Sequence, residues 1–111
     1  MSTRDRSYLR IFDANWNRAS EGIRVVEDYV RFGCNDAQLS GQLKQWRHDL
    51  AAACQAVIPQ KQRLEARNTH ADVGTELKTE SESQRIDVDA LVAANLERTQ
   101  QAIRCLEEYS K

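Results

Sequence analysis

The sequence contains few residues that break helices, and it lacks both long apolar runs and clustered cysteines. One proline and four glycines occur among 111 residues. No stretch of about 18 consecutive apolar residues is present, so no transmembrane helix is expected, and the polar segment 1–10 does not resemble a signal peptide. The three cysteines are widely spaced, which fits neither a disulfide framework nor a zinc site. We therefore expect free thiols and a cytoplasmic location.

The chain also lacks the signatures of the common nucleotide-binding and hydrolase folds. It has no glycine-rich phosphate loop with a lysine, no dinucleotide fingerprint, no nucleophile elbow and no two-histidine metal motif. Its formal net charge of −1, from 16 basic and 17 acidic residues, argues against a general binder of nucleic acid or of membrane surfaces. Twelve of the basic residues are arginine, the better bidentate partner for phosphate and carboxylate. The composition therefore leaves open a small anionic ligand.

Apolar residues recur at helical spacing in three segments, 12–30, 35–57 and 87–109. Strand patterns are weak throughout, and the polar stretch between Pro59 and the third segment shows no periodicity. Such a long connection in a small protein is often functional. The sequence therefore predicts an all-α fold, a compact bundle of about three long helices with a long ordered loop between the second and third. We expect one helical domain over residues 1–111.

The ends of these helices carry recognisable residues. Gly33 stands where a glycine commonly ends a helix, and Pro59 stops the second helix. Asn35 is expected to cap the second helix and Asp87 the third, because short polar side chains accept hydrogen bonds from first-turn N–H groups.

The first and third helices look like two copies of one element. Residues 14–29 align with residues 94–109 at an offset of 80. Packing alone would not impose the shared polar residues, so we expect the two helices to face each other around a pseudo-twofold axis, with polar groups converging on a cleft. The polar and aromatic identities are Asn15/Asn95, Arg18/Arg98, Arg24/Arg104, Glu27/Glu107 and Tyr29/Tyr109.

One flank of the first helix places Asn15 and Arg18 beside Gly22. A glycine inside a helix costs about 1 kcal/mol relative to alanine. Two interpretations are equally open: Gly22 makes room for a ligand, or it lets another helix approach closely. Arg24 and Asp28 are expected to form an exposed ion pair at i, i+4 spacing. The residues alone indicate a small helical protein with an Arg-, Asn- and acid-lined cleft suited to a small anion.

Three blocks of the sequence resemble one known family. Residues 11–32 are similar to the N-terminal signature of the small hydroxymethylpyrimidine-phosphate kinases of thiamine biosynthesis, which occur alone or fused ahead of thiamine-phosphate synthase. Residues 66–75 resemble a loop of that family, and residues 94–109 resemble its closing motif. Asn68 stands where the family pattern has Asp, and the resemblance leads us to expect a short family tail beyond Lys111.

The resemblance implies phosphorylation of hydroxymethylpyrimidine monophosphate to the diphosphate by an ATP-dependent phosphotransferase with ATP and Mg²⁺ as cofactors. Such a reaction needs positioning and charge neutralisation rather than a nucleophilic side chain. Pyrimidine phosphate and ATP are then the small-molecule partners. The resemblance also implies a functional link to thiamine-phosphate synthase. Whether the chain forms a homodimer is left open. The implied roles are phosphate binding in catalysis by Arg18, Arg67 and Arg98, substrate or phosphate binding by Asn15, Asn95, Gly74, Thr75, Arg24 and Arg104, and metal binding by Asp72, Glu27 and Glu107.

Two other functions remain open at this point. One is a non-catalytic helical docking or dimerisation domain associated with thiamine-phosphate synthase. The other is a different all-α enzyme for a small anion, resembling a chorismate mutase. The second is disfavoured because Lys44 is the only lysine within the expected helices.

Overall fold

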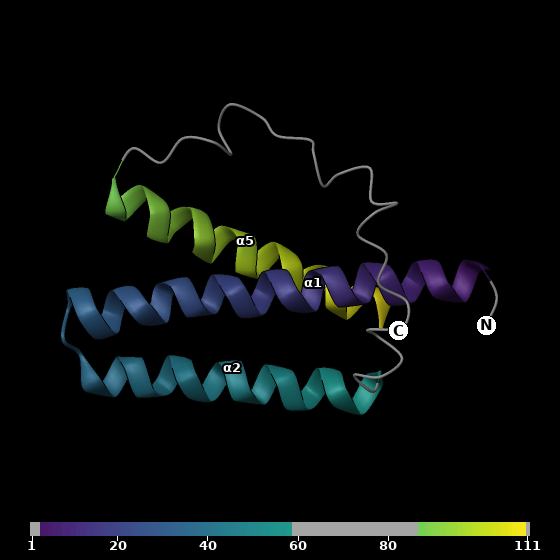
Figure 1. Ribbon diagram of the computed structural model, residues 1–111, viewed down its shortest axis with the longest axis horizontal. Coiled ribbons are helices and arrows are strands. Elements are labelled where there is room, and N and C mark those ends of the chain that lie inside the picture. The colour runs from purple at the N-terminus through teal and green to yellow at the C-terminus, as the bar shows by residue number, and fades with distance from the viewer. Residues whose placement is uncertain (1–2, 59–86, 111) are drawn as a thin grey trace.

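The computed structural model describes residues 3–58 and 87–110 (Figure 1). They form three long helices, α1 (Thr3–Asp28), α2 (Ala37–Val57) and α5 (Val88–Tyr109), and a short π-helical turn, η1 (Tyr29–Gly33), that continues α1. No strand occurs in these two ranges. The predicted all-α bundle of three long helices is confirmed, and the predicted loop lies outside the described residues.

Helix α1 is the central element of the bundle. Helices α2 and α5 both run antiparallel to it, and both pack on it (Figure 1). The contact between α1 and α5 is the more extensive, whereas α2 and α5 hardly touch. The predicted pairing of the first and third helices is therefore observed. None of the described helices combines the length and the apolar character needed to cross a membrane.

The turn between α1 and α2 differs from the prediction. Gly33 lies within η1, and the left-handed residue is Asn35, with φ of 52°. Asparagine tolerates this conformation better than most residues. The N-cap of α2 is accordingly Asp36, whose extended backbone lets its carboxylate accept a hydrogen bond from the Leu39 N–H at 2.9 Å. The predicted cap of α5 is confirmed, because Asp87 accepts from the Ala90 N–H at 2.7 Å.

The core consists of the predicted apolar stripes. One cluster joins all three helices through residues such as Phe12, Trp16, Cys54 and Leu106, and the edge of one aromatic ring meets the face of the other. A second cluster joins Val26 and Val30 to Leu43 near the α1–α2 turn. None of the three cysteines, which all lie in the described ranges, forms a disulfide, as predicted. Burial of these side chains removes apolar surface from water, which is the main force that holds three such helices together.

Gly22 lies where α1 crosses α5. A Cβ atom at this position would overlap the Thr99 Oγ1 atom and would stand 3.0 Å from the carbonyl oxygen of Asn95. Ala19 and Ala102, also buried, lie one turn away on each helix. Of the two interpretations of Gly22, close helix approach is therefore the one observed. The gap that glycine leaves is filled by the Thr99 side chain and holds no space for a ligand.

We expect Gly22→Ala to lower the free energy of unfolding by about 1–3 kcal/mol, because the added methyl group forces α1 and α5 apart. The matched control is Gly41→Ala in α2, where an added Cβ meets nothing within 4 Å. That change should raise stability by about 0.5–1 kcal/mol through the better helix propensity of alanine. Urea unfolding followed by circular dichroism measures both. Equal effects of the two changes would contradict the tight crossing.

Candidate functional site

The two asparagines of the repeat bond to the backbone of their own helices. Asn15 and Asn95 are both buried, and each donates its side-chain N–H to the carbonyl four residues earlier in its own helix, Ile11 and Leu91, both at 2.9 Å. The identical hydrogen bonds show that the repeat extends to structure. These amide groups are committed to the backbone of α1 and α5. Their predicted role in ligand binding stays a prediction.

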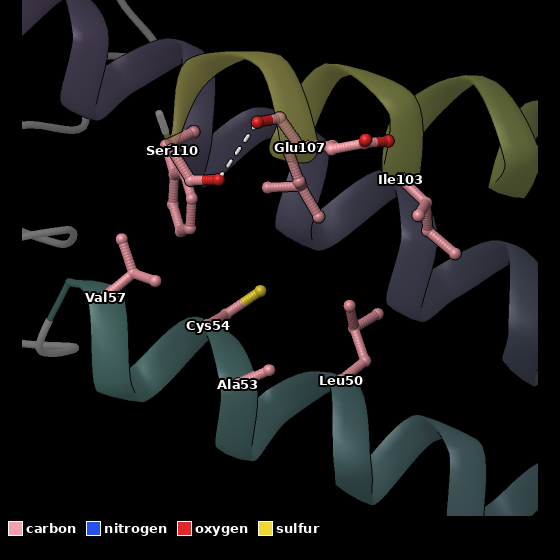
Figure 2. Close-up of a pocket in the computed structure, with 9 residues that line it drawn as sticks. Leu50, Ala53, Cys54, Val57, Ile103, Glu107 and Ser110 are labelled. Atoms are coloured by element: carbon pink, nitrogen blue, oxygen red, sulfur yellow. Dashed lines mark hydrogen bonds between the residues drawn. The ribbon is translucent and has the colours of Figure 1, made fainter.

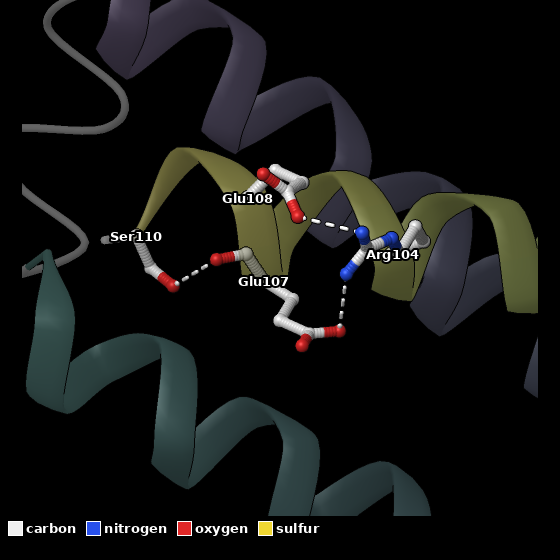
Figure 3. A network of polar contacts seen from close by, with 4 residues as sticks. All are labelled: Arg104, Glu107, Glu108 and Ser110. Atoms are coloured by element: carbon white, nitrogen blue, oxygen red, sulfur yellow. Dashed lines mark hydrogen bonds and ion pairs between the residues drawn. The ribbon is translucent and has the colours of Figure 1, made fainter.

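The arginines predicted from the repeat lie on the outside of the bundle. Arg18 is exposed, and Arg98 forms an exposed ion pair of 3.7 Å with Glu21 between α5 and α1. Arg104 contacts Glu107 at 3.3 Å and Glu108 at 2.8 Å, all within α5 (Figure 3). Exposed pairs of this kind contribute little to stability.

Four of the predicted site residues lie outside the described part of the chain. They are Arg67, Asp72, Gly74 and Thr75, and the family-like segment 66–75 lies there with them. Of the other predicted metal ligands, Glu27 and Glu107 lie in different places, one on α1 facing α2 and one on α5. Within residues 3–58 and 87–110, no group of three or more metal-binding side chains comes together.

A polar pocket of about 520 Å³ lies between the end of α1 with η1 and the start of α2. One wall comes from α1 and η1 and consists of Arg24, Glu27 and Arg31, which follow one another at i, i+3, i+7 spacing. Its other wall comes from α2 and the turn before it, namely Asn35, Asp36, Ala37, Ser40, Gly41, Lys44 and Arg47. Two of the predicted site residues, Arg24 and Glu27, are therefore brought together.

A partly buried ion pair joins the two walls of this pocket. The Arg47 Nε atom donates to the Glu27 carboxylate at 3.1 Å, and Glu27 is only 8% exposed. The predicted pair of Arg24 with Asp28 is not formed, and within the described residues Arg24 and Lys44 take part in no ion pair. Arg31 stacks on the Phe32 ring, with its guanidinium carbon 4.8 Å from the ring centre.

Tyr29, at the start of η1, interacts with Cys34 in the turn after η1 and lies near Asp89 of α5. The hydrogen bond of Tyr29 with Cys34, together with the nearby Cys34 and Asp89 groups, raises the pKa of this phenol above its usual value. Tyr29 also packs beside the Val26, Val30 and Leu43 cluster that closes this end of the bundle.

Sequence reasoning missed three basic residues of the pocket, Arg31, Lys44 and Arg47. The signal was present, because Ser40, Lys44 and Arg47 recur at i, i+4, i+7 on one face of α2. The repeat indicates a contact between α1 and α5, and the local pattern does not show which face of α2 turns toward α1. A pocket formed by two amphipathic helices needs their relative rotation, which depends on packing.

A second, apolar pocket of about 200 Å³ lies between α2 and α5, with α1 behind it (Figure 2). Side chains of Leu50, Ala53, Cys54 and Val57 line it from α2. From α5 come Ile103, Leu106, Glu107 and Ser110, and Phe12 of α1 closes the back. We call this pocket the α2–α5 groove. It exists because both outer helices pack on α1 rather than on each other.

Further apolar side chains extend the α2–α5 groove along both helices. Trp46 is one helical turn before Leu50 and is 50% exposed, while Leu96 is two turns before Ile103 and is 47% exposed. Residues three, four or seven apart share one face of a helix. Large exposed apolar faces on a small protein mark contact sites for other molecules.

Comparison with known proteins identifies relatives over nearly the whole chain. The sequence model of the ThiD2 family matches residues 10–111. A thiamine-phosphate synthase of Rhodopirellula baltica is 50% identical over 106 residues, which is 96% of this chain but 28% of that protein. A thiamine-phosphate synthase of a Synechocystis species is 46% identical over 92% of this chain and 28% of its own length. No solved structure matches the chain.

These relatives correct the enzyme class that the resemblance implied. They carry the name of thiamine-phosphate synthase, which is a different enzyme from an ATP-dependent phosphotransferase. The chain spans less than a third of the length of the curated relatives that it matches. The expected kinase assignment is therefore not retained.

We expect Arg47→Ala to lower the free energy of unfolding by about 2 kcal/mol, because it leaves the buried Glu27 carboxylate without its charged donor. Lys44→Ala, on the same face of α2 but without a partner among the described residues, should change stability by less than about 0.5 kcal/mol. Chemical denaturation measures both. If Arg47→Ala and Lys44→Ala were equally mild, the Glu27–Arg47 contact would not support the fold.

Proposed function

Because the chain belongs to the ThiD2 family, we propose that it is a helical docking domain that works with thiamine-phosphate synthase in thiamine biosynthesis. The observation that carries this proposal is the α2–α5 groove. The groove is apolar over its floor, and Glu107 and Ser110 give it a polar edge at one end. An apolar centre with a polar rim is the usual composition of a protein–protein contact.

The relatives supply the reason to choose the synthase as the partner. In proteins named thiamine-phosphate synthase, the part similar to this chain is 28% of the length, so most of each protein lies outside the similarity. A helical unit joined to a larger body in one polypeptide packs against that body only where it offers a sizeable apolar surface. The exposed apolar faces of α2 and α5 provide such a surface without disturbing the core.

The chemistry of the groove favours contact over catalysis. Its lining supplies one carboxylate, Glu107, and that carboxylate is engaged by Arg104 on the same helix. A docking role requires neither ATP nor Mg²⁺, and the binding of these cofactors stays a prediction from the resemblance. Binding of the pyrimidine phosphate likewise stays a prediction from the resemblance.

The test measures whether this chain associates with the thiamine-phosphate synthase of the same organism. Light scattering on a size-exclusion column detects the complex. We expect a complex whose dissociation constant rises at least about tenfold in the double variant Val57→Gln, Ile103→Gln, because both side chains lie in the groove. Val88→Gln is the matched control. Val88 is as exposed as Val57, 55% against 51%, and lies at the other end of α5, outside the groove.

Three outcomes would overturn the docking proposal. A homodimer that dissociates in the double variant would assign the groove to a second copy of this chain. An unchanged complex in the double variant would place the contact elsewhere. ADP release from Mg-ATP in the presence of hydroxymethylpyrimidine monophosphate would contradict a non-catalytic role.

A further inference from the structure

We propose that a single amphipathic helix of the synthase occupies the α2–α5 groove and completes a four-helix bundle. This inference rests on the docking function proposed above and names the structural element that binds. The helix is at least about three turns long and runs parallel to α1. Three features of the groove point to such a partner, namely its composition, its shape and the charge at one of its ends.

The described lining of the groove offers few hydrogen-bond partners to an occupant. Hydrocarbon side chains form most of it, together with the Cys54 thiol, a weak hydrogen-bonding group. Its two polar side chains lie at one end, and both are engaged within α5 (Figure 2, Figure 3). The Ser110 hydroxyl donates to the Glu107 carbonyl at 3.1 Å, and the Glu107 carboxylate pairs with Arg104. Most backbone groups of the two walls bond within their own helices.

An occupant of this groove must therefore satisfy its own backbone. An extended segment would bury unpaired N–H and C=O groups against the apolar lining, which is costly because those groups give up hydrogen bonds to water. A helix pairs its N–H and C=O groups internally and presents only side chains. An amphipathic helix that lays its apolar face into a groove is a common mode of peptide recognition. The composition of the groove thus favours a helix.

The groove also has the shape of a missing helix position. On α2 its apolar side chains follow one another at i, i+4, i+7, i+11, namely Trp46, Leu50, Ala53 and Val57. This row is about 16 Å long, or three helical turns. Because α2 and α5 pack on α1 and hardly touch each other, a helix between them contacts both and lies diagonally opposite α1. The small Ala53 leaves a hole for a larger side chain of the incoming helix.

The charge at one end of the groove sets the direction of the incoming helix. Val57 is the last residue of α2 and Ser110 follows the last residue of α5, and both line the groove. Helix C-termini carry partial negative charge. Glu107 and Glu108 add two carboxylates against the single guanidinium of Arg104. The positive N-terminal end of a helix fits here, so the incoming helix runs antiparallel to α2 and α5, as neighbours in up-down bundles do.

Hydrogen exchange of the synthase, alone and bound to the full chain, tests whether one helix binds. We expect one continuous segment of at least about 11 residues, three helical turns, to gain protection. A synthetic peptide of that segment should become helical by circular dichroism when the chain is added. Protection spread over several separate segments, or a peptide that binds without gaining helicity, would overturn the helix and leave docking intact. Failure to form any complex would overturn both proposals.

A bulky side chain in the middle of the groove tests where the helix lies. Ala53→Trp fills the hole and should weaken the complex at least about tenfold, since the incoming helix cannot approach. Ala52→Trp is the matched control, because Ala52 is also exposed on α2 but lies outside the groove lining. Circular dichroism of the free variants checks that both remain folded. Unchanged binding in Ala53→Trp would overturn the proposal.

A charge reversal at the end of the groove tests the direction. Glu107→Lys should weaken the complex about threefold at low ionic strength, because it places a positive charge against the N-terminal end of the incoming helix. Glu97→Lys changes the net charge equally and is the control, since Glu97 bonds Gln101 along α5 and lies outside the lining. A tighter complex in Glu107→Lys, or equal effects of the two variants, would overturn the assigned direction.

Discussion

Close contact between α1 and α5 at Gly22 and Thr99 determines how the rest of the bundle can form. The two helices approach until a side-chain hydroxyl of one fills the space that the other leaves without a Cβ atom. Thr99 turns its own hydroxyl back to the Asn95 carbonyl at 2.8 Å, so this buried polar group is satisfied. With α5 committed to α1 along most of its length, α2 is left to pack on a different side of α1.

Both candidate sites follow from this arrangement. Because α1 is shared, α2 and α5 stand apart and the groove between them stays open. The same sharing brings the basic face of α2 against the end of α1, where Glu27 and Arg47 join the two walls. Helix α2 thus presents apolar residues such as Val57 to one site and cationic residues such as Lys44 to the other. An amphipathic helix can contribute one face to each of two sites only when its neighbouring helices lie on one side of it.

Much of the fold could be predicted from the sequence, and less of the site. Helical periodicity is a local property, so the three helices and the Asp87 cap were predictable. The α2 cap was misplaced by one residue because a π turn shifts the left-handed residue from Gly33 to Asn35. The repeat correctly paired α1 with α5. It could not show that Asn15 and Asn95 bond their own helices, or that Arg47 reaches Glu27, because those contacts depend on helix rotation and packing.

The two copies of the repeat differ in the ion pairs that their matching residues form. Arg24 and Glu27 in α1 correspond to Arg104 and Glu107 in α5. In α5 the two side chains pair with each other at 3.3 Å, while in α1 the glutamate has turned to Arg47 of α2 and the arginine is left unpaired. The difference arises because a residue of α2, Arg47, reaches the glutamate of α1 but not that of α5. The same pair of residue types therefore stays within one helix in α5, whereas in α1 its glutamate links two helices.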